Sequence, residues 1–212
     1  MSEQDPYCYS QSEVLRNSFD FRNQADLSKA EARLTVLRLD QLQKRPVAGK
    51  FDLEHLRDIH RHIFRDVYPW AGQLRTVSMS KGASLFCRQE FLADEGKRIF
   101  DQLKRENVLR ALPQETFCGR LAYYFGEINA LHPFREGNGR SQRVLLGDIA
   151  RQAGYQIDFR SISRESMIEI SRDAQGGRLE SVVASFNAAT TTLPARAHSL
   201  TKQRCKARDE GR

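Results

Sequence analysis

An all-α domain with one small β-hairpin is the fold that this sequence predicts. Apolar residues recur at steps of three and four almost throughout the chain, which is the pattern of amphipathic helices. That period changes once, between residues 76 and 87, where a short hairpin fits better. The 212 residues are 40% hydrophobic and 29% charged, which is typical of a folded domain and not of a disordered or fibrous chain.

Three helices are predicted before the hairpin. A short one is expected around residues 12–18. The second begins near Ser28, which can form a capping box with Glu31, and runs to about Lys44, before Pro46 ends it. Its inward face is expected to contain Ala30, Leu34, Leu37 and Gln41.

Asp52 is the expected N-cap of the third helix, and Pro69 ends it. Its inward face is expected to contain Leu53, Leu56, His60, Ile63 and Val67. The grouping of His55, His60 and His62 suggests zinc, but His60 and His62 face apart on a helix and no cysteine is near. We therefore expect surface or half-buried helix histidines.

The hairpin is expected from Thr76–Met79 and Ser84–Cys87, on either side of Lys81-Gly82. Of the helices that follow, the clearest begins near Thr116 and ends at His132-Pro133, because proline disfavours the helical conformation in the residue before it. Its inward face is expected to contain Phe117, Leu121, Tyr124, Ile128 and Leu131. The other helices are expected at residues 89–106, 140–153, 164–174 and 179–190.

Charge is distributed unevenly along the chain. The net charge is +7, and residues 196–212 alone contribute six basic and two acidic residues, or +4. We therefore expect a domain over residues 1–193 and a basic tail or linker over residues 194–212. Nucleic-acid binding is not favoured, because aromatic and basic residues do not alternate.

Cysteine usage and hydropathy indicate an ordinary intracellular setting. The four cysteines are scattered and form no CxxC pair, which is typical of free thiols. The chain has no apolar run near the ~18 residues of a membrane span and no basic-then-apolar leader. A cytoplasmic protein without a membrane span is expected, delivered to another cell only if it is part of a larger effector.

Residues 132–143 are the stretch that carries chemistry. Gly137-Asn138-Gly139 can take positive φ at low cost, so the loop can turn several backbone N–H groups toward one anion. A helix then opens, and its N-terminus adds further N–H groups and a positive dipole end. Arg140 and Arg143 lie in its first turn, and their planar guanidinium groups suit phosphate oxygens. This arrangement predicts a polyphosphate site.

Three further residues of this stretch complete the predicted site. His132 is placed to act as a general base, because an unperturbed imidazole titrates near pH 6.5. Glu136 is a single carboxylate beside a phosphate site, which is typical of Mg²⁺. Phe134 is expected to anchor the loop in the core. Each feature alone is common in proteins without a site there, but their joint occurrence over twelve residues is specific.

The stretch resembles the signature of the Fic family, His-x-Phe-x-(Asp/Glu)-Gly-Asn-Gly-Arg-x-x-Arg, and matches it at every fixed position. Trp70-Ala71-Gly72 resembles the element before the family's flap. The resemblance covers about residues 6–190 and implies the Fic fold, a helical bundle with one small hairpin flap. It is strongest to the short bacterial Fic toxins of toxin–antitoxin modules and to the Fic domains of secreted effectors.

The resemblance implies a Mg²⁺- and ATP-dependent protein adenylyltransferase, which moves AMP to a hydroxyl side chain of a target protein. It makes His132 the base and Glu136 the metal ligand. It assigns the phosphates to Gly137, Asn138, Gly139, Arg140 and Arg143. The hairpin near Val77–Phe86 would be the flap that pairs with the target backbone. Relatives of the Doc kinase toxin carry lysine at the position of Gly139, so glycine favours AMP transfer over phosphate transfer.

The resemblance also implies partners. The short Fic toxins modify type II topoisomerases, DNA gyrase and topoisomerase IV. Many Fic proteins carry an inhibitory (Ser/Thr)-x-x-x-Glu-(Gly/Asn) helix, whose glutamate pairs with the arginine that corresponds to Arg143. The chain has no full match, because Ser166 follows Ser161–Glu165 and Gln175 replaces the acid after Ser171. We therefore expect a small antitoxin that supplies this glutamate in trans.

Two alternatives stay open. One is Fic-type transfer of another group, such as UMP, phosphate or phosphocholine. The other is a non-catalytic basic module that binds a partner through its tail.

Overall fold

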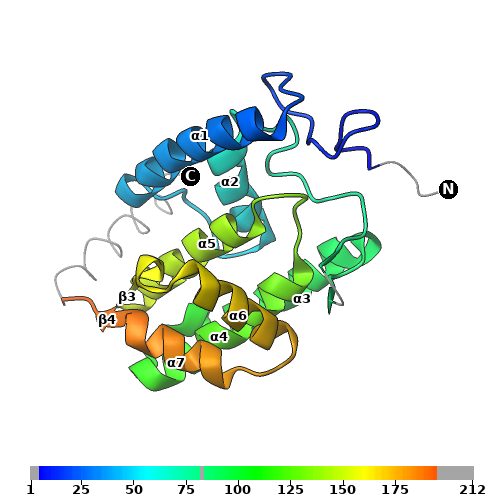
Figure 1. The fold of residues 1–212 in the computed structure, drawn as a ribbon. Coiled ribbons are helices and arrows are strands. Elements are labelled where there is room, and N and C mark those ends of the chain that lie inside the picture. The colour runs from blue at the N-terminus through cyan, green and yellow to red at the C-terminus, as the bar shows by residue number, and fades with distance from the viewer. Residues whose placement is uncertain (1–4, 82–83, 195–212) are drawn as a thin grey trace, which may run out of the picture.

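A computed structural model describes residues 5–81 and 84–194, and these are mostly helical (Figure 1). The α-helices are α1 (Gln24–Lys44), α2 (Leu53–Phe64), α3 (Leu92–Arg105), α4 (Gln114–Leu131), α5 (Asn138–Ala153), α6 (Arg164–Gln175) and α7 (Glu180–Ala189). Short 3₁₀ turns are η1 (Gln89–Phe91), η2 (Asn107–Leu109) and η3 (Phe159–Ser161). The predicted all-α class with one small hairpin is confirmed in its main features.

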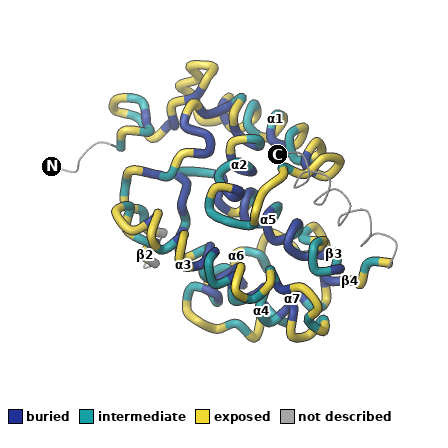
Figure 2. Tube along the Cα trace, turned by 180° about the vertical axis from the view of Figure 1, so that it is seen from behind, coloured by how far each residue is buried: buried dark blue, intermediate teal, exposed yellow. Residues whose placement is uncertain are grey.

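Helix α5 runs through the middle of the molecule and packs on both α2 and α4 (Figure 1). Helix α1 covers α2 on one side, whereas α6 and α7 cover α4 on the other. Buried residues run along the central helices, while the outer side of α1 and the ends of the bundle are exposed (Figure 2). The motif stretch therefore lies where α4 ends and α5 begins, at the junction of the two halves.

Helix starts agree with the sequence only in part. Asp52 caps α2 as predicted and accepts the His55 N–H at 2.8 Å. The predicted caps Ser28 and Thr116 are wrong, because α1 begins after Asn23 and α4 after Pro113. The predicted inward face of α1 is also wrong in part. Leu37 is 60% exposed, and the helix instead buries Leu27, Thr35 and Leu42.

The strands of the hairpin are shorter than predicted, and the structure contains a second small sheet that was not predicted. In the hairpin, β1 (Ser80–Lys81) pairs with β2 (Ser84–Leu85), two residues each. A second antiparallel sheet joins β3 (Tyr155–Ile157) to β4 (Thr190–Thr192). The expectation of one β element was therefore wrong, because these three-residue strands are hidden at helix ends.

The short helix predicted around residues 12–18 does not form. Residues 12–18 form bends and irregular backbone, and Cys8 and Leu15 make an isolated antiparallel bridge. The side chain of Asn17 forms the hydrogen bonds of this segment in place of a helix. Its Nδ2 donates to the carbonyls of residues 15 and 21, and its Oδ1 accepts the N–H groups of residues 19 and 21. The predicted tail lies outside the described residues beyond Pro194. Within the described residues, none of the helices combines the length and the apolarity that crossing a bilayer requires.

Candidate active site

His132 ends α4 in a left-handed conformation, with φ 45° and ψ 61°. Its N–H donates to Ile128 O at 3.1 Å, so the helix stops one residue before Pro133, as predicted. The imidazole is half-buried and stacks on Phe86, with ring centroids 3.8 Å apart and planes 14° apart. The flap residue Phe86 thus covers one face of the imidazole of the candidate base.

Arg75 joins this end of α4 to both arms of the flap. Its side chain is fully buried, and Nε donates to His132 O at 2.7 Å. Nη1 donates to Val77 O at 2.5 Å, and Nη2 donates to Cys87 O and, at 3.4 Å, to Leu131 O. No carboxylate among the described residues pairs with it, and burial lowers the pKa of its guanidinium. The cation is held by carbonyl oxygens alone.

The loop after His132 is closed by its own side chains. Asn138 accepts the Phe134 N–H at 2.8 Å and donates to Phe134 O at 2.7 Å. Gly137 takes φ +81°, and a Cβ there would lie 2.3 Å from the Phe64 ring. Of the three residues that can take positive φ at low cost, only Gly137 does so, because Asn138 and Gly139 are already the first residues of α5. The Asn138 side chain holds the loop, and the N-terminus of α5 faces the site with its backbone N–H groups.

His60 supports this loop from α2. Its ring stacks on Phe134, which is buried as predicted, with centroids 3.9 Å apart. Nδ1 accepts the Gly72 N–H at 2.8 Å and Nε2 donates to Glu136 O at 2.9 Å, so the neutral tautomer is specified. Burial lowers the pKa of His60 to about 4. The prediction of surface or half-buried histidines was wrong for His55 and His60, which are buried.

Glu136 offers one carboxylate oxygen to a ligand. Oε1 accepts the Gly137 N–H at 2.8 Å and lies 3.3 Å from Arg140 Nη2, whereas Oε2 makes no bond with the described residues. Those residues contain no cluster of three acidic, cysteine or histidine side chains, so the protein supplies few ligands. One half-exposed carboxylate beside a helix N-terminus fits Mg²⁺ that is held mainly by a nucleotide and water.

The two arginines of the motif have different surroundings. Arg140 pairs with Glu31 at 2.7 Å and Glu136 at 3.3 Å. The Arg143 guanidinium makes no ion pair or hydrogen bond with any described residue, and burial together with Arg140 lowers its pKa. Gly139 leaves it room, since a Cβ there would lie 3.2 Å from Arg143 Nη1. Arg143 is therefore a cation without a counterion in this part of the chain.

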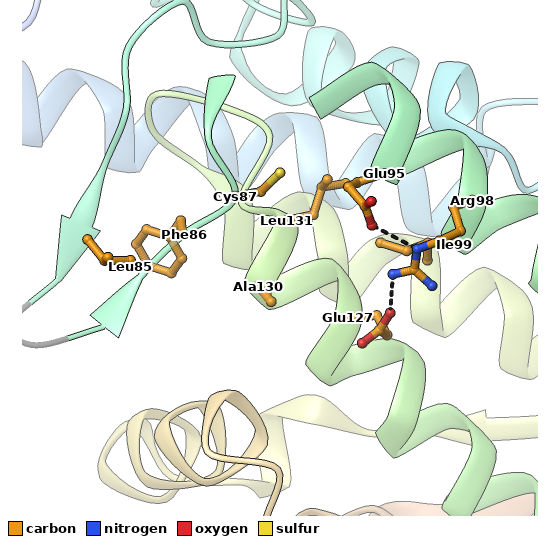
Figure 3. A pocket seen from close by; sticks show the side chains of 9 residues that line it. All are labelled: Leu85, Phe86, Cys87, Glu95, Arg98, Ile99, Glu127, Ala130 and Leu131. Atoms are coloured by element: carbon orange, nitrogen blue, oxygen red, sulfur yellow. Dashed lines mark hydrogen bonds and ion pairs between the residues drawn. The ribbon is translucent and has the colours of Figure 1, made fainter. Parts of the chain in front are cut away.

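A pocket of about 300 Å³ is lined by the second arm of the flap, α3 and the C-terminal end of α4 (Figure 3). Its apolar wall includes Phe86, which follows β2, Ile99 of α3 and Leu131 of α4. Its polar rim is self-paired, because Arg98 bonds Glu95 and Glu127, each at 2.7 Å. This pocket could not be predicted from the sequence, because it forms only when the three segments meet.

Sequence reasoning missed Arg75, His60 and Glu31. His60 lay on the predicted apolar face of α2, which was a signal for burial that the histidine grouping obscured. Arg75 and Glu31 had no comparable signal, because their partners are distant in the sequence.

Comparison with known proteins agrees with this geometry. A sequence model of the Fic/DOC family matches residues 50–150. The chain is 36% identical to the probable protein adenylyltransferase Fic of Escherichia coli K12 over 86% of this chain and 90% of that protein. The chain belongs to the Fic/DOC family, and the predicted family, fold class and enzyme class are confirmed.

Two further relatives bear on the site. The chain is 40% identical to the protein adenylyltransferase VbhT of Bartonella schoenbuchensis over 82% of this chain, but it spans only 36% of the length of VbhT. The N-terminal Fic domain of a Bartonella quintana effector, solved with bound ADP, is 29% identical and superposes with a TM-score of 0.85 over 89% of this chain and 96% of that domain.

Proposed function

We propose that this chain transfers AMP from ATP to a hydroxyl side chain of a target protein. The observation that carries the proposal is the junction of α4 and α5, where His132 ends one helix and the next begins with free N–H groups and carries Arg143, which has no counterion among the described residues. The names of the adenylyltransferase relatives and the ADP in the Bartonella quintana domain support the same class of reaction.

The proposed roles follow from this geometry. His132 takes the proton of the incoming hydroxyl, whose oxygen bonds the α-phosphorus of ATP as the bond to the β-phosphate breaks and pyrophosphate leaves. The backbone of Gly137, Asn138 and Gly139 and the Arg143 guanidinium bind phosphate oxygens. Glu136 binds Mg²⁺, which neutralises phosphate charge when it is bound. Catalysis then rests on positioning and on charge neutralisation.

The flap provides the target side of the site in this proposal. A target segment adds as a strand along residues 77–86, and its hydroxyl reaches His132 beside Phe86. The pocket of Figure 3 lies on the same side. The two alternatives make different predictions. Transfer of UMP, phosphate or phosphocholine would give another adduct, whereas a binding module would give none.

Regulation by a small antitoxin is the second part of the proposal. An external glutamate that pairs with Arg143 would occupy the position of a phosphate. No carboxylate of the described residues plays this part, which supports a brake in trans. The protein alone should be active and toxic to a host cell, and it should be silent with its partner co-expressed. A many-fold gain of activity on deleting either end of the chain would instead place the brake inside it.

The target remains a matter of resemblance to the short Fic toxins. We propose a type II topoisomerase, DNA gyrase or topoisomerase IV, met in the cytoplasm. Incubation of purified gyrase with the enzyme and ATP labelled in the α-phosphate tests this directly. Removing residues 194–212 in the same assay shows whether the basic tail contributes to target modification.

A further inference from the structure

A row of side chains links α1 to the motif loop. The Tyr68 hydroxyl donates to Glu31 Oε2, and Glu31 Oε1 pairs with Arg140 Nη1 at 2.7 Å. Arg140 Nη2 in turn lies 3.3 Å from Glu136 Oε1. Glu31 on the first helix is thus connected, through one guanidinium, to the proposed metal ligand.

The row is held in place by packing. The Arg140 guanidinium lies over the Phe64 ring, 4.6 Å from its centroid, and Phe64 fills the space beside Gly137. The side chains of Glu31 and Arg140 are only 16% and 25% exposed. An ion pair so shielded from water, with both carboxylate oxygens occupied, has a better-defined geometry than an exposed pair.

The two carboxylates also change what Arg140 can do. Flanked by Glu31 and Glu136, its charge is already compensated, whereas Arg143 has no such partner among the described residues. Arg143 is therefore the better phosphate ligand, and Arg140 is better suited to orient Glu136.

We propose that Glu31 is a positioning residue of the nucleotide site. It holds Arg140 so that Arg140 bonds one oxygen of Glu136 and leaves the other for the metal ion. The inference rests on the proposed function, because it needs Mg²⁺–nucleotide at Glu136. Without Glu31, Arg140 would turn toward Glu136, bond both its oxygens and compete with the metal.

The test is the binding of a non-hydrolysable ATP analogue, measured by calorimetry across a Mg²⁺ titration and again in EDTA. Glu31→Gln keeps the shape of the side chain and removes its charge. It should raise the Mg²⁺ concentration at half-maximal binding about 10-fold, the scale typical of lost support to a metal ligand. Binding in EDTA should be unchanged. Tyr68→Phe should cause a smaller shift in the same direction.

Two matched variants exclude simpler explanations. Asp40→Asn removes one charge from the same helix at an exposed pair with Lys44. Asp66→Asn breaks the Arg38 pair that also ties α1 to the end of α2. Both should keep the wild-type Mg²⁺ dependence. A shift in Asp66→Asn equal to that of Glu31→Gln would mean loss of α1 docking and would overturn the inference.

Failure of the inference and failure of the proposed function are distinguishable. If the wild type binds the analogue with Mg²⁺ dependence and Glu31→Gln leaves that dependence unchanged, only the role of Glu31 is wrong. If the wild type does not bind the analogue, and Glu136→Ala and Arg143→Ala behave like the wild type, then the proposed nucleotide site is wrong. The role of Glu31 is then wrong as well.

Discussion

The imidazole of His132 lies flat against the ring of Phe86, with centroids 3.8 Å apart. One residue ends α4 and the other follows the second strand of the flap, so this stack joins the candidate base to the element proposed to hold the target. A hydroxyl held along the flap would therefore meet the base at the stacked ring.

His132→Ala should remove transfer while nucleotide binding and folding stay near wild type. Its ring stacks on Phe86 of the flap, and the phosphates are assigned to other residues. General bases typically supply 10²–10⁴-fold, so the rate of AMP transfer should fall at least about 100-fold. Steady-state rates and analogue binding on one preparation check this. A rate above about a hundredth of wild type would show that His132 is not the base.

Arg75→Lys should destabilise the fold and misplace the flap. A lysine ammonium cannot reach the carbonyls of residues 77, 87, 131 and 132 together, and each buried carbonyl left without a donor costs about 1–3 kcal/mol. We expect at least about 2 kcal/mol lost in urea unfolding. Arg57→Lys is the control, because Arg57 also donates to a carbonyl, Gly72 O, but is partly exposed. Equal losses of unfolding free energy for the two variants would argue against a special role of Arg75 in holding the flap to the end of α4.

His60 should make stability depend on pH. Its pKa is about 4 in the folded protein and about 6.5 when unfolded, so between these values only the unfolded chain takes up the proton. Its contribution is complete above pH 6.5 and is lost as pH falls to 4, at about 1.4 kcal/mol per pKa unit. Urea unfolding of wild type and His60→Gln from pH 7 to 4 should show a shallower fall in the variant. Parallel curves would mean that His60 is not buried as a neutral ring.

Met79→Pro tests strand addition at the flap. Met79 O accepts the Phe86 N–H at 3.2 Å, and proline keeps that carbonyl while it removes the Met79 N–H. Target modification should be lost while analogue binding is retained. Met79→Ala keeps the N–H and should behave like wild type. Normal modification by the proline variant would rule out target pairing through this N–H.

The parts of the site that are contiguous in the sequence could be predicted. His132-Pro133 ends a helix for a local steric reason, and Gly137 adopts the positive φ that glycine takes at low cost. The contact of the Asn138 side chain could not be predicted in the same way. An asparagine at the start of a helix can face a ligand or close its own loop, and here its side chain bonds the backbone of Phe134.

Residues that act across the fold could not be predicted. Arg75 bonds only main-chain carbonyls, which every sequence offers, so no partner residue type indicates its position. Glu31 meets Arg140 only because α1 packs on α2, and helical periodicity does not specify that register. The strands Tyr155–Ile157 and Thr190–Thr192 are too short for an alternating pattern to be distinguished from helix ends.

The central claim is that this chain transfers AMP, and parallel labelling tests it most directly. A bacterial lysate is incubated with the wild type or His132→Ala and with ATP labelled in the α- or the γ-phosphate, and labelled proteins are identified by mass spectrometry. Transfer of AMP should give α-label and the mass of one AMP group on a hydroxyl side chain, with the wild type only. Transfer of γ-label, or no His132-dependent label from either ATP, would contradict it.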